Sequence, residues 1–177
     1  MNNIKNLLLI LFCLLSPVGI MTQSDSLAKQ QEALKKLDFL VGNWQGAGWI
    51  MLGQGKRETF TINETVQSKV NGTVLLVEGA GKNAENKLVH NALAVLSFDA
   101  EKQNYRWHAF TLNGNSVEVI PQVSDKKFVW GFRLPQGETR FTITLNEKGN
   151  WFEIGEFLPD GGKNWFKNFE MELKKVS

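Results

Sequence analysis

Apolar and polar residues alternate with a period of two through most of the chain beyond Gly42. The alternation is clearest at 59–66, 127–134 and 140–145. Before Gly42 the apolar residues recur at nearly helical spacing, and Ser24, Asp25 and Ser26 are favourable helix caps. The pattern therefore predicts one helix at about 25–38, followed by a long series of strands.

Residues that favour turns separate these strands at regular intervals. Asn71-Gly72 and Asn113-Gly114 are signals for tight hairpins. Further turns are expected at 53–55, 81–86, 99–104, 124–126, 135–137, 148–150 and 159–162. Nine turns give ten strands, and the absence of a helical pattern between them excludes parallel crossovers. We predict an all-β fold, an antiparallel up-and-down β-barrel of about ten strands with the helix capping one end; a β-sandwich is the alternative.

The first residues have the pattern of a secretory signal peptide. Lys5 supplies the positive charge, and the apolar run at 7–15 is short for a membrane span. We predict a signal peptide over 1–22, one barrel domain over 23–177, and export to the periplasm or the extracellular space. An uncleaved anchor is the alternative, and no membrane span is expected in the mature chain.

Composition narrows the possible partners of the mature chain. The only cysteine, Cys13, lies in the predicted signal peptide, which leaves no disulfide and no thiolate metal site. Of the 20 basic residues only Lys5 is removed with that peptide, so 19 remain against 18 acidic residues. This scattered and balanced charge excludes a field that would attract nucleic acid or anionic lipid.

The more apolar face of each strand is expected to point into the barrel. The residues placed inside by this rule are Phe60, Ile62, Val66, Phe128, Trp130, Phe132, Phe141, Ile143, Leu145, Phe152, Ile154, Leu158, Phe169, Met171 and Leu173. Among the tryptophans, Trp44 and Trp130 are expected in the core, and Trp49, Trp107, Trp151 and Trp165 at rims or on the surface.

The same rule carries ionisable groups into the lumen. Glu64 and Glu156 share the inward parity of their strands, and Arg106 and His108 join them if their ambiguous strand faces that way. In one interpretation Arg106 only neutralises the glutamates, because an unpaired buried charge is costly. In the other, these groups orient the polar head of a ligand while aromatic side chains hold its apolar body. The predicted ligand-binding residues are Glu64, Arg106, His108, Trp130 and Glu156.

The sequence assigns no catalytic residue and no metal site. It contains no defensible Ser-His-Asp set, Gly-x-Ser-x-Gly or phosphate loop. A zinc site would need both His90 and His108 together with a carboxylate. No cofactor is predicted, although haem, which needs only one axial histidine, stays open.

Several segments resemble the bacterial family named domain of unknown function 1579. The similarity covers the Phe-Leu-Val-Gly-Asn-Trp opening at 39–48 and the segments 71–79, 90–99, 129–132 and 165–171. The resemblance implies a calycin-like barrel, similar to lipocalins and fatty-acid-binding proteins. It implies no activity and no catalytic residue.

A more distant resemblance links the chain to nitrobindin-type haem barrels. Gly42, Trp44, Gly46 and Gly48 match their Gly-x-Trp-x-Gly-x-Gly opening. The late-strand histidine that would bind iron is missing, because no histidine follows His108.

Three functional hypotheses follow from the sequence. The first is an exported barrel that binds a small apolar or amphipathic molecule in its lumen. The second is a cavity enzyme that uses lumen Glu, Arg or His groups for acid–base chemistry, and the third is a haem-binding barrel. The first is favoured, and an enzyme is disfavoured.

Overall fold

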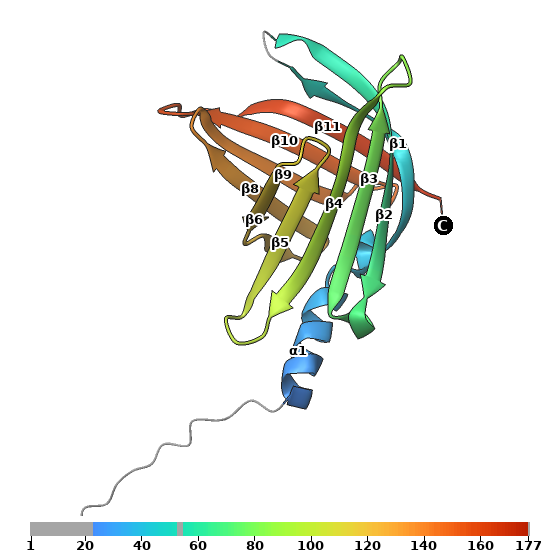
Figure 1. Ribbon diagram of the computed structural model, residues 1–177, viewed down its shortest axis with the longest axis vertical. Helices are drawn as coiled ribbons and strands as arrows, with labels where there is room; N and C mark the ends of the chain where they lie inside the picture. The colour runs from blue at the N-terminus through green and yellow to red at the C-terminus, as the bar shows by residue number, and fades with distance from the viewer. Residues whose placement is uncertain (1–22, 53–54, 177) are drawn as a thin grey trace, which may run out of the picture.

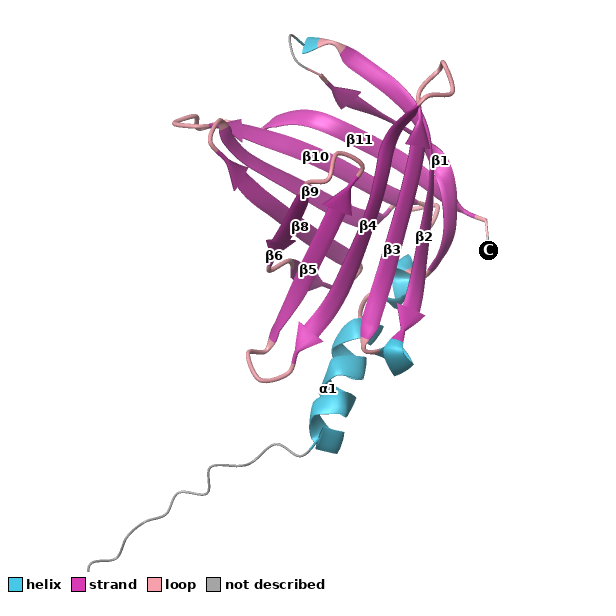
Figure 2. Ribbon diagram, viewed as in Figure 1, coloured by secondary structure: helices cyan, strands magenta, loops and turns pink. Residues whose placement is uncertain are grey.

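A single antiparallel sheet of eleven strands forms the body of the protein (Figures 1 and 2). This computed structural model describes residues 23–52 and 55–176. The helical elements are α1 (Gln23–Lys35), η1 (Asp38–Leu40) and η3 (Val70–Gly72). The strands are β1 (Gly42–Met51), β2 (Arg57–Lys69), β3 (Val74–Lys82), β4 (Leu88–Asp99), β5 (Asn104–Thr111), β6 (Ser116–Val119), β7 (Gln122–Ser124), β8 (Lys127–Leu134), β9 (Gly137–Leu145), β10 (Trp151–Pro159) and β11 (Phe166–Lys175).

The strand order is β6-β5-β4-β3-β2-β1-β11-β10-β9-β8-β7. Two meanders, β1–β6 and β7–β11, therefore meet at the pairing of the first strand with the last, and the sheet curls into a half-barrel (Figure 1). The predicted fold class is confirmed. One strand more than expected is found because Pro121, which has no backbone N–H, follows Ile120 and divides the segment 116–124 into β6 and β7.

The helix begins and ends two to three residues earlier than predicted, and η1 follows it. Ala33 and Leu34 are buried, whereas Leu27 is exposed, so only the last turns of α1 pack on the sheet. Tyr105 Oη donates to the Ala33 carbonyl at 2.9 Å, and Gln31 Nε2 donates to the Asn71 carbonyl at 2.7 Å. These contacts hold α1 at one end of the half-barrel (Figure 2). No described helix is long and apolar enough to cross a membrane.

The inward parity predicted for β2, β8, β9 and β11 is confirmed. Their inward residues belong to the buried core, pack against it or line the cavity described below. The prediction is wrong for β10, where Trp151 and Glu153 are buried in place of Phe152 and Ile154. The predicted signal peptide lies outside the described residues.

Trp44 anchors the closed end of the half-barrel and lies in the core, as predicted. Its side chain is 2% exposed, and its Nε1 donates to the Leu40 carbonyl at 2.7 Å. The ring meets Trp151 edge-on, with ring centroids 5.8 Å apart. A Cβ on Gly46 would come within 2.9 Å of the Leu173 Cα, so glycine is needed for β11 to approach β1 here.

Replacing Trp44 with alanine is expected to destabilise the fold strongly. A buried aromatic side chain truncated to alanine costs roughly 3–5 kcal/mol. For a domain of this size, that lowers Tm by roughly 10 °C. Thermal unfolding followed by circular dichroism measures the change. Trp49→Ala on the same strand is the control, because Trp49 is only half-buried, under the Arg57 guanidinium. Equal losses in the two variants would contradict the anchoring role.

Candidate functional site

The sheet encloses a cavity of about 910 Å³. It extends from Leu40 and Trp151, at the end that carries α1, to Ile50, Leu52 and Leu134 at the opposite end. The latter three side chains are exposed, so this end is the mouth. A volume of this order is typical of a site for a small organic molecule.

Aromatic rings from five strands form a continuous belt along the cavity wall. The belt consists of Phe60 (β2), Phe169 (β11), Phe141 (β9), Trp130 (β8) and Trp107 (β5). Successive ring centroids lie 5.8, 5.8, 4.5 and 5.6 Å apart. The last contact joins β5 to β8 across the edges formed by β6 and β7, so the aromatic belt supports the cavity where backbone pairing is interrupted. Trp130 lines the lumen as predicted, whereas Trp107 and Trp151 are buried rather than at the surface.

Glu64 points into the cavity from β2, as its parity predicted. Its side chain is 7% exposed. A Cβ on Gly79, in the neighbouring strand β3, would lie 2.7 Å from Glu64 Oε2, so glycine is needed there to leave room for the carboxylate. Burial raises the pKa of Glu64 from 4.5 to about 7.

Glu153 is a second buried carboxylate in the same cavity, and parity analysis of the sequence missed it. It is 6% exposed, and it accepts a hydrogen bond from Trp151 Nε1 at 3.2 Å. Burial, and then the nearby Glu64 carboxylate, raise the pKa of Glu153 to about 8. The cavity therefore holds two buried carboxyl groups whose pKa values are both raised.

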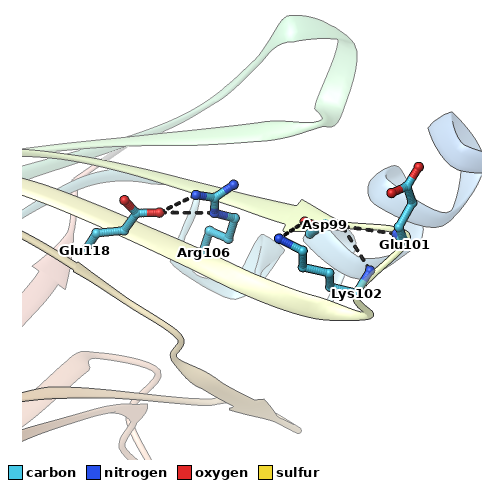
Figure 3. A network of polar contacts seen from close by, with 5 residues as sticks. All are labelled: Asp99, Glu101, Lys102, Arg106 and Glu118. Carbon is cyan, nitrogen blue, oxygen red and sulfur yellow. Dashed lines mark hydrogen bonds and ion pairs between the residues drawn. The ribbon is translucent and has the colours of Figure 1, made fainter.

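Arg106 does not reach the lumen. It lies on the outer face of β5, where its Nε donates to Glu118 Oε1 at 3.1 Å and its Nη2 pairs with the same oxygen (Figure 3). Lys102 and Asp99 form a separate network at the β4–β5 turn. The expectation that Arg106 neutralises the lumen glutamates is therefore wrong, because the ambiguous strand turns Trp107 and Ala109 inward.

His108 and Glu156 are also outside the cavity. The His108 ring packs on Phe110, with centroids 4.2 Å apart, on the outer face of β5. Glu156 accepts hydrogen bonds from Arg140 Nη2 at 2.8 Å and Nε at 3.1 Å on the outer face of β9 and β10. Of the predicted site residues, the structure brings only Glu64 and Trp130 to the lumen.

His90 is the histidine that lines the cavity, from β4. Burial lowers its pKa, which favours the neutral imidazole. Within residues 23–52 and 55–176, no group of three or more His, Cys, Asp or Glu residues is arranged to hold a metal ion.

One hydrogen-bond donor in the cavity wall lacks a partner. Trp107 Nε1 is buried, and no acceptor for it is found among the described residues. Because a buried N–H without an acceptor is costly, this donor is a position where a ligand oxygen or nitrogen would be favourable.

Solved structures of other proteins share this fold. Rv2717c from M. tuberculosis matches with a TM-score of 0.62 and 12% identity, over 82% of this chain and 98% of that chain. The S-type phycobiliprotein lyase CPES from Guillardia theta matches with a TM-score of 0.53 and 11% identity, over 83% of this chain and 92% of that chain. Both are calycin-like barrels, and the fold of this chain is calycin-like. No family model and no curated protein matches the sequence.

The stability of the fold is expected to fall as the pH rises from 5 to 9. Because the pKa of Glu64 is raised on folding, the native state binds more protons than the unfolded state between pH 4.5 and about 7. The stabilisation is complete below pH 4.5 and is lost as the pH passes about 7, on the order of 3 kcal/mol for this one group.

Thermal unfolding across this pH range tests the coupling. Glu64→Gln is expected to flatten the decline in Tm by several degrees, because an amide does not titrate. Glu78→Gln, on the exposed outer face of β3, is the control and should follow the parent. Parallel curves for the parent and Glu64→Gln would show that Glu64 is not titrating in the folded protein.

Proposed function

We propose that this protein is an exported barrel that binds a small, mostly apolar molecule in its lumen. The observation that carries the proposal is the cavity of about 910 Å³, which has apolar and aromatic walls and two buried carboxylates. Ligand sites have this composition, with apolar walls for affinity and a few fixed polar groups for orientation. Export rests on the signal peptide that the first 22 residues predict.

Membership of the domain of unknown function 1579 family is part of this proposal. Two residues that carry the resemblance stabilise the closed end of the half-barrel. Trp44 anchors this end, and Gly46 permits the contact of β1 with β11. The calycin-like fold agrees with that family. The phycobiliprotein lyase shares the architecture. Because the two sequences are only 11% identical, we do not assign lyase activity to this chain.

A cavity enzyme is disfavoured by the positions of its candidate groups. Such an enzyme would use Glu64 or Glu156 together with Arg106 or His108. Of these four side chains, Glu156, Arg106 and His108 face outward. Glu64 lies in the lumen with a pKa of about 7. The ionisable group near it is the carboxyl of Glu153, not a base or a cation. We assign a catalytic role to neither.

Haem binding is the second candidate, because His90 faces the cavity. It would be the axial ligand, and the bound porphyrin would supply the iron chemistry. Reconstitution with haemin is expected to give a Soret band that His90→Ala abolishes and His108→Ala retains, since His108 lies outside. A parent without a Soret band, or a band that survives in His90→Ala, would remove this candidate.

Filling the cavity tests the leading proposal. Ala92 lines the lumen from β4, and Ala80 is exposed on the outer face of the adjacent strand β3. Ala92→Phe is expected to weaken binding of a solvatochromic apolar probe such as Nile red by about tenfold or more, the equivalent of about 1.4 kcal/mol. Ala80→Phe should bind the probe like the parent.

Native mass spectrometry of protein from its own host supplies the second measurement. A co-purified small molecule is expected in the parent and in Ala80→Phe, and at much lower occupancy in Ala92→Phe. A parent that carries no ligand and does not respond to the apolar probe would overturn the proposal.

A further inference from the structure

Among residues 23–52 and 55–176, the two lumen carboxylates have no cationic partner. Glu64 receives neither a hydrogen bond nor an ion pair from the described residues, although its side chain is more than nine-tenths buried. Glu153 has only the Trp151 N–H as a donor. Both side chains line the same cavity, near the end that Trp44 closes.

The remaining charged groups of the cavity wall lie toward the mouth or are already bound. Arg133 pairs with Asp160 at 2.9 Å, and both side chains are exposed. Glu58 accepts a hydrogen bond from Asn83 Nδ2 at 3.3 Å, at the β3–β4 end of the cavity. His90 lies on β4, opposite Gly81 in the register. None of these groups supplies a positive charge to Glu64 and Glu153.

We propose that the closed end of the cavity is a head-group site for an organic ammonium ion, with Glu64 and Glu153 as its counter-ions and the aromatic belt around its apolar body. The inference rests on the proposed function and specifies the chemistry of its ligand. Two carboxylates at one end of an apolar cavity favour a cationic head and repel an anionic one.

The walls around the carboxylates select an organic cation over a hydrated metal ion. The aromatic belt presents ring faces, which attract an ammonium group and pack against hydrocarbon. No cluster of three metal-binding side chains occurs in the described part of the chain. The exposed apolar side chains at the mouth suit the far end of an amphipathic molecule whose charged end lies innermost.

Binding of an ammonium ion at this site is expected to be accompanied by a measurable release of protons. Near neutral pH the acid pair holds at least one proton, because the pKa of Glu153 is about 8. An ammonium ion that binds there replaces that proton as the source of positive charge, so its binding releases protons to the solvent.

Three ligands with the same twelve-carbon chain provide the test: dodecylammonium and dodecanoate, used below their micelle concentrations, and dodecanol, used below its solubility limit. Isothermal titration calorimetry of the full mature chain at pH 7.5 gives the affinities, and buffers of different ionisation enthalpy give the protons released. Dodecylammonium is expected to bind about tenfold more tightly than dodecanol, with proton release, and dodecanoate more weakly than either.

Variants assign this preference to the two carboxylates. Glu64→Gln combined with Glu153→Gln is expected to weaken dodecylammonium binding about tenfold, to abolish proton release, and to change dodecanol binding less than threefold. If the double variant does not fold, the single variant Glu64→Gln is expected to weaken dodecylammonium binding and to lower the proton release only in part, because Glu153 remains. Glu78→Gln, exposed on the outer face, should match the parent.

The outcomes separate this inference from the proposed function. Equal affinity for dodecanol and dodecylammonium, or tightest binding of dodecanoate, would overturn the ammonium site and leave an apolar-ligand barrel standing. A preference for dodecylammonium that survives both substitutions would also overturn it. Binding of none of the three chains would contradict the proposed function itself.

Discussion

The ladder between β1 and β11 is the interaction on which the cavity depends. It joins the two meanders, and it requires backbones to approach where Gly46 and Gly48 face Leu173 and Met171. A side chain at either glycine would push β11 away, and the two meanders would no longer face each other. Trp44 closes one end of the half-barrel beside this ladder, where its ring packs on Trp151 from β10. Closure and lumen are consequences of one strand pairing.

The same ladder explains why Glu64 and Glu153 meet. They lie on β2 and β10, which are separated in the sheet by β1 and β11. Curvature across these four strands turns both side chains toward one cavity, where the Glu64 carboxylate adds to the effect of burial in raising the pKa of Glu153. The hydrocarbon around them gives the coupling its strength, since repulsion between charges grows as water is excluded.

The fold was largely predictable, because period-two alternation and turn residues report local geometry. Two of the five predicted site residues, Glu64 and Trp130, lie in the lumen for the same reason, because they share their faces with clearly apolar neighbours. Glu153 was missed because β10 is more apolar on its outer face, with Phe152 and Ile154. A signal was present in the hairpin before it. Leu145 pairs with Trp151 and Ile143 with Glu153, and directly opposite residues lie on the same face. The proximity of the two glutamates had no local signal, because it arises from sheet curvature over four strands.

Burying two carboxylates without a cationic partner at the closed end of a barrel carries a desolvation cost. Apolar residues of similar volume would pack there without a desolvation cost, and buried charges are in general no more stabilising than such replacements. The surrounding structure accommodates the acids rather than avoiding them. Gly79 leaves the room that the Glu64 carboxylate occupies, and the Trp151 N–H orients Glu153. Departures from local packing rules concentrate at functional sites, where stability is given up for binding. The closed end of the lumen is such a departure, and this is the physical reason for proposing ligand recognition there rather than at the mouth.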